Sequence, residues 1–589
     1  MNKKRIFNHN RIGEIRPNQL ITTFGPGSIH DAVKDSLTIL DINYWEDGGR
    51  RINDGRLASY FGVSHFRSPK TSDDKDLPVV SFPHYHVCSN IKCNNLFDIR
   101  TKLDVPTYLK LGPRCPDCGF PAYPSRFVIA CKDGHLDDFP WHWWVHKGSS
   151  SCRGDLKLYS TGWTSTLGEI IIECSCGAKR SMAGSTDKEE FIGGGYQCTG
   201  HHPHRPKSKN EKCNCTDIYP AQRGASNIYF PVIRSAISIP PWTNPLYTLL
   251  DDHYIRICDY KRDFGEAGVT KIFENYFSDK YSREEFDKAL KMRDEKIKEF
   301  IEIKEMEYKA FTKHKDLDYK KDYKFFKAHE DEVPAYLQRY FKRIIKIERL
   351  REVMVLQGFM RIDPPEPEVD NLGKMVKLQK TRENWLPGVE INGEGIFIEF
   401  NKESINDWLQ KDSVHRLSHT YKTLFKTYCD SRGWENSKER DAQYVLLHTF
   451  SHLLIKEMAL LSGYSSTAIK ERIYSSDTMY GILLYTGSSD KDGSLGGLVE
   501  LGSEDNFKKI LRSALENSLL CTTDPQCSNH EIDVDTLNGS ACHSCGMVSE
   551  TACENGNRLL DRSLIVPLDE KEENSFFKEL VEELCEIKV

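Results

Sequence analysis

Closely spaced cysteines are the residues of this chain whose types and spacing best suit chemistry. Cys88 and Cys93 are followed, after 21 intervening residues, by Cys115 and Cys118 in a Pro-Asp-Cys-Gly knuckle. Two thiolate pairs carried by a hairpin satisfy tetrahedral Zn²⁺; the alternatives are an iron–sulfur cluster or four unrelated core cysteines. Because four thiolates leave no open coordination position, we predict a structural zinc ribbon and not a catalytic metal.

Two further sets of cysteines each offer five candidates for the four positions of a zinc site. Histidines at 201, 202 and 204 lie close to the second set. The second set consists of Cys174, Cys176, Cys198, Cys213 and Cys215, and the third of Cys521, Cys527, Cys542, Cys545 and Cys553. We predict one structural zinc ion in each set, with the exact ligands left open, and two to three zinc ions in the whole chain.

Two other stretches carry metal-binding residue types. Residues 131–144 (CKDGHLDDFPWHWW) contain one cysteine, two histidines, three aspartates and three tryptophans, which would suit either a corner of a metal hydrolase or a tight aromatic-lined turn. No hydrolase or deaminase signature accompanies them, so we favour the turn. His448 and His452 share one face of a predicted helix, but leucines flank them and no third ligand is evident. We expect these two to be buried, hydrogen-bonded histidines.

A basic segment next to the second cysteine set is the candidate for contact with DNA phosphates. A solvated loop explains it equally well. Its residues are Lys179, Arg180, Arg205, Lys207, Lys209 and Lys212.

The chain lacks the phosphate-binding motif of a nucleotide-driven motor. Residues 24–28 and 493–498 are glycine-rich, but neither ends in the Gly-Lys-Ser/Thr whose lysine meets the phosphates. We therefore expect no ATPase activity and predict that the chain is not an enzyme.

Composition limits the class of protein. The 589 residues are 39% hydrophobic and 29% charged, with a net charge of -6, so overall charge does not attract the chain to nucleic acid. The N-terminus lacks the apolar stretch of a secretory signal, and we expect no membrane span and a cytoplasmic location. There, 19 cysteines cannot mostly be disulfides, and their clustering favours metal.

The elements that must position these residues suggest a multi-domain α+β protein. We predict a β-rich segment at 1–82, a zinc-binding region at 83–240, a helical region at 241–360, a proline-rich linker at 361–384 and a C-terminal domain at 385–589. The prediction of the helical region depends on apolar residues that recur with a period of about 3.6 within 284–309. Strands are expected at 226–236 and 480–485, a hairpin turning at Asn392-Gly393, and a helix at 442–461.

Several unusual strings run nearly end to end and carry a resemblance to a known family. They are Arg16-Pro17-x-Gln19-Leu20, Phe24 to Ser28, residues 131–144, Gln222 to Asn227, Gly393 to Phe397 and the helix of His448 and His452. Together they resemble the DrmB family, which is encoded beside a DrmA helicase in DISARM phage-defence systems. Residues 385–561 resemble a domain of unknown function that ends certain DEAD/DEAH-box repair helicases, where its cysteines bind zinc.

The resemblance implies a complex with a separate DrmA-like helicase, DNA binding by the pair, and restriction of invading phage DNA alongside a methyltransferase. It supplies no catalytic residue. We therefore expect a non-catalytic helicase partner. The rivals are a free-standing zinc-dependent DNA-binding module and a metal-dependent nuclease that uses His135, Asp137 and Asp138 or the His448/His452 helix.

Overall fold

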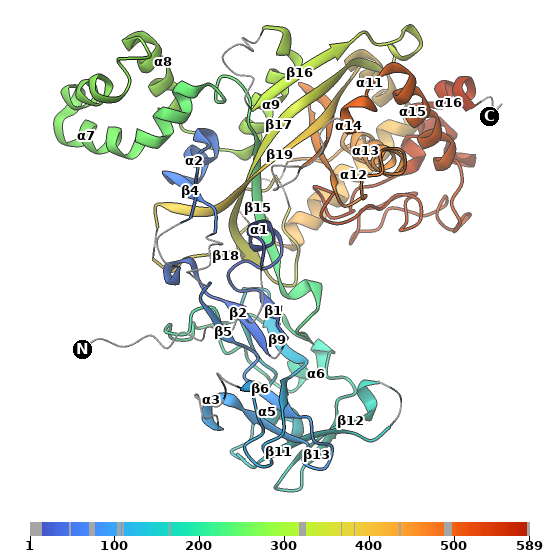
Figure 1. The fold of residues 1–589 in the computed structure, drawn as a ribbon. Coiled ribbons are helices and arrows are strands. Elements are labelled where there is room, and N and C mark those ends of the chain that lie inside the picture. Colours follow the sequence, from blue (N-terminus) through green and yellow to red (C-terminus); the bar gives the residue numbers. More distant parts are fainter. Residues whose placement is uncertain are drawn as a thin grey trace.

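A computed structural model describes residues 15–585 except 34, 46–48, 70–76, 103–107, 109–110, 163, 165, 317–324, 367, 371, 382, 435–437 and 488–496. Most of the glycine-rich stretch 493–498 therefore lies outside the described residues. Figure 1 shows a strongly twisted central sheet, with an N-terminal lobe at one end, a helical projection beside it and the C-terminal helices on its other side. The described chain mixes helices and strands, which confirms the α+β prediction.

The central sheet joins nine strands from distant parts of the chain. Its main path runs β15-β17-β19-β21-β20, with β16 and β18 paired to β17, and β3 paired to β4, which pairs with β19. The bounds are β3 Arg51–Ile52, β4 His65–Arg67, β15 Phe230–Ile237, β16 Phe326–Asp331, β17 Phe341–Met360, β18 Val376–Lys377, β19 Trp385–Phe400, β20 Ile469–Ser476 and β21 Met479–Thr486. The strand predicted at 480–485 is thus confirmed as β21, and the one predicted at 226–236 is confirmed as β15 except for its first residues, which form a short 3-10 helix at Ser226–Ile228.

The predicted hairpin at Asn392-Gly393 is wrong, because β19 runs straight through it as one strand. The pairing of β19 with β17 slips between Ile347 and Leu350, opposite this point. A Cβ atom at Gly393 would lie only 1.6 Å from the carbonyl oxygen of Thr486. The glycine therefore permits close approach of a neighbouring backbone at an irregularity in the sheet, and it does not form a turn.

Residues 241–384 differ from the predicted helical region and linker. The region is helical at first, in α7 (Pro245–Tyr276), α8 (Arg283–Asp294) and α9 (Phe300–Thr312), but it ends in β16 and β17. The apolar period within 284–309 belongs to α8 and α9, whose apolar residues are buried. The proline-rich stretch then joins β17 to β19, two neighbours in one sheet, so it is a connection within the sheet and carries β18 itself.

The C-terminal region packs helices on the central sheet around the largest hydrophobic core. These helices are α11 Lys402–Leu409, α12 Asp412–Ser431, α13 Ala442–Ser462, α14 Gly497–Glu500, α15 Glu504–Ser518 and α16 Lys578–Cys585. The helix predicted at 442–461 is confirmed as α13. By length and composition α13 is the one described helix that could cross a membrane, but it is mostly buried, as a core helix is.

The N-terminal lobe is made of short strands and turns (Figure 1). It contains a six-stranded sheet, β13-β12-β11-β7-β6-β8, and two three-stranded sheets, β1-β2-β5 and β10-β9-β14. The strands are β1 Ile29–Asp31, β2 Ser36–Ile39, β5 Val79–Ser81, β6 Tyr85–Cys88, β7 Asn95–Asp98, β8 Ala122–Pro124, β9 Phe127–Cys131, β10 Leu136–Asp138, β11 Leu156–Ser160, β12 Ile170–Cys174, β13 Lys179–Ser181 and β14 Ile218–Gln222. The helices of the lobe are α3 Ile99–Lys102, α5 Trp141–Val145 and α6 Lys188–Gly193. Two further helices, α1 Pro17–Thr22 and α2 Gly55–Phe61, instead lie beside the central sheet and share a hydrophobic core with its strands (Figure 1).

Candidate metal centres

Among the residues that the structure describes, at least five groups of four cysteine, histidine or glutamate residues lie close enough to hold a metal ion. Within each group, the ligand atoms all lie within 4.8 Å of one another. All 19 cysteines are free thiols, so no disulfide competes for these sulfurs. Zinc prefers four tetrahedrally arranged ligands drawn from thiolates and imidazoles. The residues of these groups therefore fit zinc.

The first group, which we call the ribbon cluster, matches the sequence prediction in all four ligands. Cys88 ends β6, and its sulfur lies 3.4 Å from that of Cys118. The sulfurs of Cys93 and Cys115 are 3.7 Å apart. The hairpin of β6 and β7 presents one cysteine pair and the Pro-Asp-Cys-Gly knuckle presents the other. The cluster is closed by four protein ligands.

Backbone amides favour the ionised form of two of these cysteines, Cys118 and Cys176. The backbone N–H of Phe120 lowers the pKa of Cys118 to about 7. The backbone N–H of Ala178, with help from His146, lowers the pKa of Cys176 to about 6. Because the thiolate is the form that binds metal, these cysteines carry the charge that a divalent cation requires near neutral pH.

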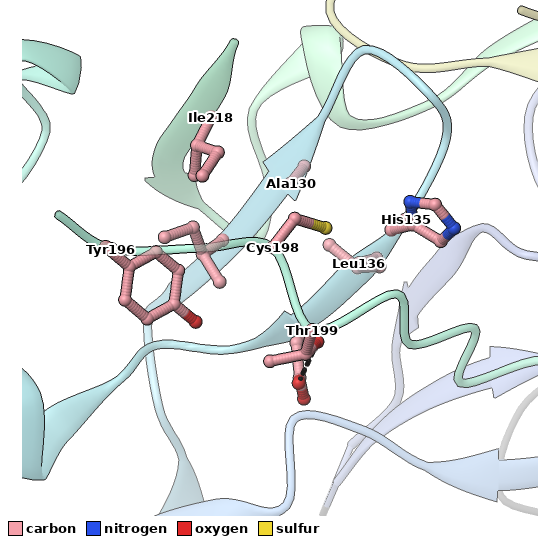
Figure 2. Close-up of a pocket in the computed structure, with 9 residues that line it drawn as sticks. Ala130, His135, Leu136, Tyr196, Cys198, Thr199 and Ile218 are labelled. Atoms are coloured by element: carbon pink, nitrogen blue, oxygen red, sulfur yellow. Dashed lines mark hydrogen bonds between the residues drawn. The ribbon is translucent and has the colours of Figure 1, made fainter. Parts of the chain in front are cut away.

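The second group, the hairpin cluster, consists of Cys131, His135, Cys198 and Cys213. Cys131 ends β9 and His135 precedes β10, so the tight turn between these strands places the Cys131 sulfur 3.3 Å from His135 Nδ1. The Cys198 sulfur lies 3.6 Å from that of Cys131, and in Figure 2 it points toward the His135 ring. Cys213 completes the group 3.9 Å from Cys131.

The cavity beside the hairpin cluster is too small for a substrate. It is lined by residues that include Tyr196, Thr199 and Ile218, and its volume of about 10 Å³ is room for about one water molecule. Of the remaining residues in 131–144, Trp141 and Trp144 are fully buried in the core of the lobe. Asp137 accepts a hydrogen bond from Thr199. The stretch forms the turn between β9 and β10, β10 itself and most of α5, so only its first part is a turn, and its cysteine and first histidine join a candidate metal cluster.

The third group, the nested cluster, consists of His146, Cys152, Cys174 and Cys176. His146 follows α5, and its Nδ1 donates to the carbonyl of His142 at 2.7 Å, which leaves Nε2 free to face Cys176 at 3.3 Å. Cys152 lies 3.6 Å from Cys174. Such a bond from the second ring nitrogen to a carbonyl is what orients metal-binding histidines.

The single site expected from the second cysteine set is therefore wrong. Cys174 and Cys176 belong to the nested cluster, whereas Cys198 and Cys213 belong to the hairpin cluster. Cys215 is in neither group; its backbone N–H donates to the Cys213 sulfur. The predicted zinc ligands did not include Cys131, His135, His146 or Cys152, although the Cys131-x3-His135 spacing across a turn was a signal for the first two.

The fourth group, the C-terminal cluster, takes four of the five predicted cysteines. The sulfurs of Cys521 and Cys542 are 3.4 Å apart, and those of Cys527 and Cys545 are 3.6 Å apart. The hydrogen bond with Cys527 is the largest cause that lowers the pKa of Cys545 to about 5. The fifth candidate, Cys553, lies elsewhere, in a group with His448, His452 and Glu471. The expectation that these histidines lack further ligand partners is thus also wrong.

The predicted basic segment is split by the fold. Arg180 lies over the Trp144 ring and pairs with Glu190, and Lys179 pairs with Glu173. Arg205 is buried. Lys179 is exposed beside Glu173, and the other exposed members are Lys207, Lys209 and Lys212. If the lobe contacts phosphates, these exposed lysines are the residues available for it.

Arg205 is expected to contribute to stability and not to DNA affinity. Its guanidinium donates to the Asp41 carboxylate at 2.8 Å and to the Lys377 carbonyl at 2.5 Å, so it fastens the lobe to β18 of the central sheet. Because Asp41 is fully buried, Arg205→Ala should lower the free energy of unfolding by about 2 kcal/mol. Denaturant titration and fluorescence anisotropy with labelled DNA measure the two quantities. Weaker DNA binding with unchanged stability would contradict this assignment, and Lys209→Ala is the exposed control.

The fold and its clusters define a multi-domain protein that carries several thiolate-rich candidate metal centres, each with four protein ligands. Residues 16–230 match a domain of unknown function, DUF8724, and residues 450–546 match the MrfA Zn-binding domain. The chain is 46% identical over 569 residues to the DISARM protein DrmB of Bacillus paralicheniformis, an alignment that covers 94% of this chain and 100% of that protein. The chain therefore belongs to the DrmB family of DISARM proteins.

Proposed function

We propose that the chain is a non-catalytic, zinc-stapled partner subunit of the DISARM helicase, acting in the cytoplasm against invading phage DNA. The observation that carries this proposal is that a DrmB-family chain holds a MrfA-type zinc-binding domain without any Gly-x4-Gly-Lys-Ser/Thr motif among its 589 residues. A helicase needs that motif to hold nucleotide phosphates. The motor then comes from another chain, the DrmA-like helicase.

The closed geometry of the cysteine clusters supports a structural role for zinc. Hydrolysis at a metal needs a coordination position for water, and catalytic zinc sites keep one open. Each of the four clusters described above offers four protein ligands. The ions would supply folding energy to segments of short strands and turns, and the residues would present surfaces to a partner.

Exposed apolar side chains near the C-terminal cluster suit a docking surface for the motor. Leu460 and Leu461 near the end of α13 are 78% and 56% exposed, and Leu520 just after α15 is 80% exposed. The two helices pack on each other, with Glu457 of α13 accepting hydrogen bonds from Ser513 and Asn517 of α15. Large apolar side chains gathered in water are typical of an interaction surface.

The test compares the purified chain, the DrmA helicase and their mixture. We expect no ATP hydrolysis and no DNA cleavage by the chain alone, complex formation on gel filtration, and changed DNA-stimulated ATP hydrolysis in the mixture. Leu460→Asp with Leu520→Asp should weaken the complex at least tenfold, because it places charge in a desolvated interface. Phe264→Asp, at an exposed apolar residue of α7, is the matched control.

Two outcomes would favour the rival functions. DNA cleavage by the chain alone, abolished by a chelator, would indicate a metal-dependent nuclease. Salt-sensitive DNA binding without the helicase, lost in a Lys207, Lys209 and Lys212 triple alanine variant, would indicate a free-standing DNA-binding module.

A further inference from the structure

Four potential ligands meet in the interior of the C-terminal region, apart from the cysteines of the C-terminal cluster. His448 and His452 lie one turn apart on α13, Glu471 lies on β20, and Cys553 lies in a turn that contacts β20. The side chains of both histidines and of Glu471 have no exposed surface. We refer to these four residues as the His–Glu–Cys cluster.

The two imidazole rings are held so that one nitrogen of each faces the middle of the cluster. His448 Nδ1 donates to the carbonyl of Leu559 at 3.2 Å, and His452 Nδ1 donates to that of Gly546 at 2.8 Å. A carbonyl oxygen only accepts, so each Nδ1 carries a proton. The Nε2 atoms lie 3.0 and 3.4 Å from the same oxygen of Glu471. Metal-binding histidines are oriented in this way.

The anionic ligands are also supported from outside the cluster. The Cys553 sulfur lies 3.2 Å from His448 Nε2 and accepts the backbone N–H groups of Asn555 and Asn557, each at 3.2 Å. Glu471 accepts the backbone N–H of Glu554 at 3.1 Å and the hydroxyl of Ser451. The donors thus surround the cluster, and the lone pairs of its four ligands converge inside it.

An ion pair without metal leaves this arrangement incomplete. One imidazolium paired with Glu471 would still leave Nε2 of His452, which is buried and 3.4 Å from the same Glu471 oxygen, without a hydrogen bond. An unsatisfied buried polar atom costs about 1–3 kcal/mol. A divalent cation serves all four atoms together, and with one carboxylate and one thiolate it brings the net charge to zero.

We propose that His448, His452, Glu471 and Cys553 bind a second structural zinc ion in the C-terminal region, distinct from the ion of the C-terminal cluster. Zinc binds well to four tetrahedral ligands such as two imidazoles, a thiolate and a carboxylate. Because all four ligands come from the protein, no coordination position is open for catalysis. The ion would tie α13 to β20 and to the turn at Cys553. This inference does not depend on the helicase partnership.

Metal analysis of the full-length chain tests the proposal. After removal of loose metal, Glu471→Gln with Cys553→Ser should contain one zinc ion fewer per chain than the unmodified protein. Cys585→Ala, which removes a buried thiol from α16, should lose none. Cys542→Ala with Cys545→Ala should lose a different ion, so the two losses should add in the quadruple variant. An unchanged zinc content in the first variant would overturn the proposal.

A measurement on the unmodified protein covers the case in which the variant does not fold. Diffraction data collected at the zinc absorption edge should give an anomalous difference map with a peak between the Nε2 atoms of His448 and His452. A map with a peak at the C-terminal cluster but none at the His–Glu–Cys cluster would also overturn it.

Discussion

Replacing Cys542 and Cys545 together by alanine is expected to release one zinc ion and unfold the segment that follows α15. Residues 519–561 contain no helix or strand, so the C-terminal cluster stands where a hydrogen-bonded ladder would otherwise hold the chain. Structural zinc contributes roughly 10–16 kcal/mol in small zinc domains, which exceeds the net stability of most domains, about 5–15 kcal/mol. Limited proteolysis, zinc content and phage-defence activity measure the effect.

The loss should extend to the helicase complex, because the unfolded segment adjoins the proposed docking surface at Leu520. Leu537 and Leu559 of this segment, and Leu564 just after it, are buried in the largest hydrophobic core. Cys258→Ala, which removes an exposed thiol from α7, is the control and should change neither zinc content nor defence. A double alanine variant that still forms the complex and still protects cells would refute the proposed role of this domain.

How much of the metal chemistry could be predicted depends on how local the ligands are. The ribbon cluster uses two cysteine pairs that are adjacent in sequence, and four ligands for four positions leave one solution. The hairpin cluster instead joins Cys131 and His135 to Cys198 and Cys213, and all ligands of the nested cluster lie between these halves. Spacing alone cannot separate two interleaved sites, because the pairing of β9, β10 and β14 decides which ligands meet.

The histidines of α13 are buried and hydrogen-bonded as expected, but their neighbouring ligand candidates were missed for a related reason. Their apolar neighbours correctly indicated burial, but their partners Glu471 and Cys553 come from β20 and from a turn about a hundred residues along the chain. Periodicity describes one helix and contains no information on what packs against it. In the same way, Asn392-Gly393 favours a turn locally. Pairing within the sheet overrides that preference, and the backbone carbonyl of Thr486 packs close against Gly393, where a side chain would not fit.

Glu307→Ala is expected to lower the free energy of unfolding by about 3–5 kcal/mol, the usual cost of removing one partner from a buried ion pair. Glu307 of α9 receives two hydrogen bonds from the Arg472 guanidinium of β20, at 2.7 and 3.1 Å, and one from the backbone N–H of Ile237 in β15, at 2.8 Å. Both charged side chains are buried, so the alanine variant leaves Arg472 charged with only the more distant Glu554 carboxylate, 3.7 Å away, as its counterion. Denaturant titration and hydrogen exchange of α9 measure the loss.

This carboxylate matters more than its charge alone suggests, because β15 and β20 stand at opposite ends of the main sheet path and share no hydrogen-bonded ladder. Glu307 of α9 contacts both of these strands. Its loss should therefore raise the hydrogen-exchange rate of α9 more than that of the central strands. Glu307→Leu with Arg472→Met should recover most of the lost stability, since an apolar pair of similar size carries no buried charge. Glu348→Ala, in an exposed pair with Lys327, should change stability by less than about 0.5 kcal/mol. A loss in Glu307→Ala no larger than in this control would mean that water reaches Arg472 and that α9 is not fixed to the sheet by charge.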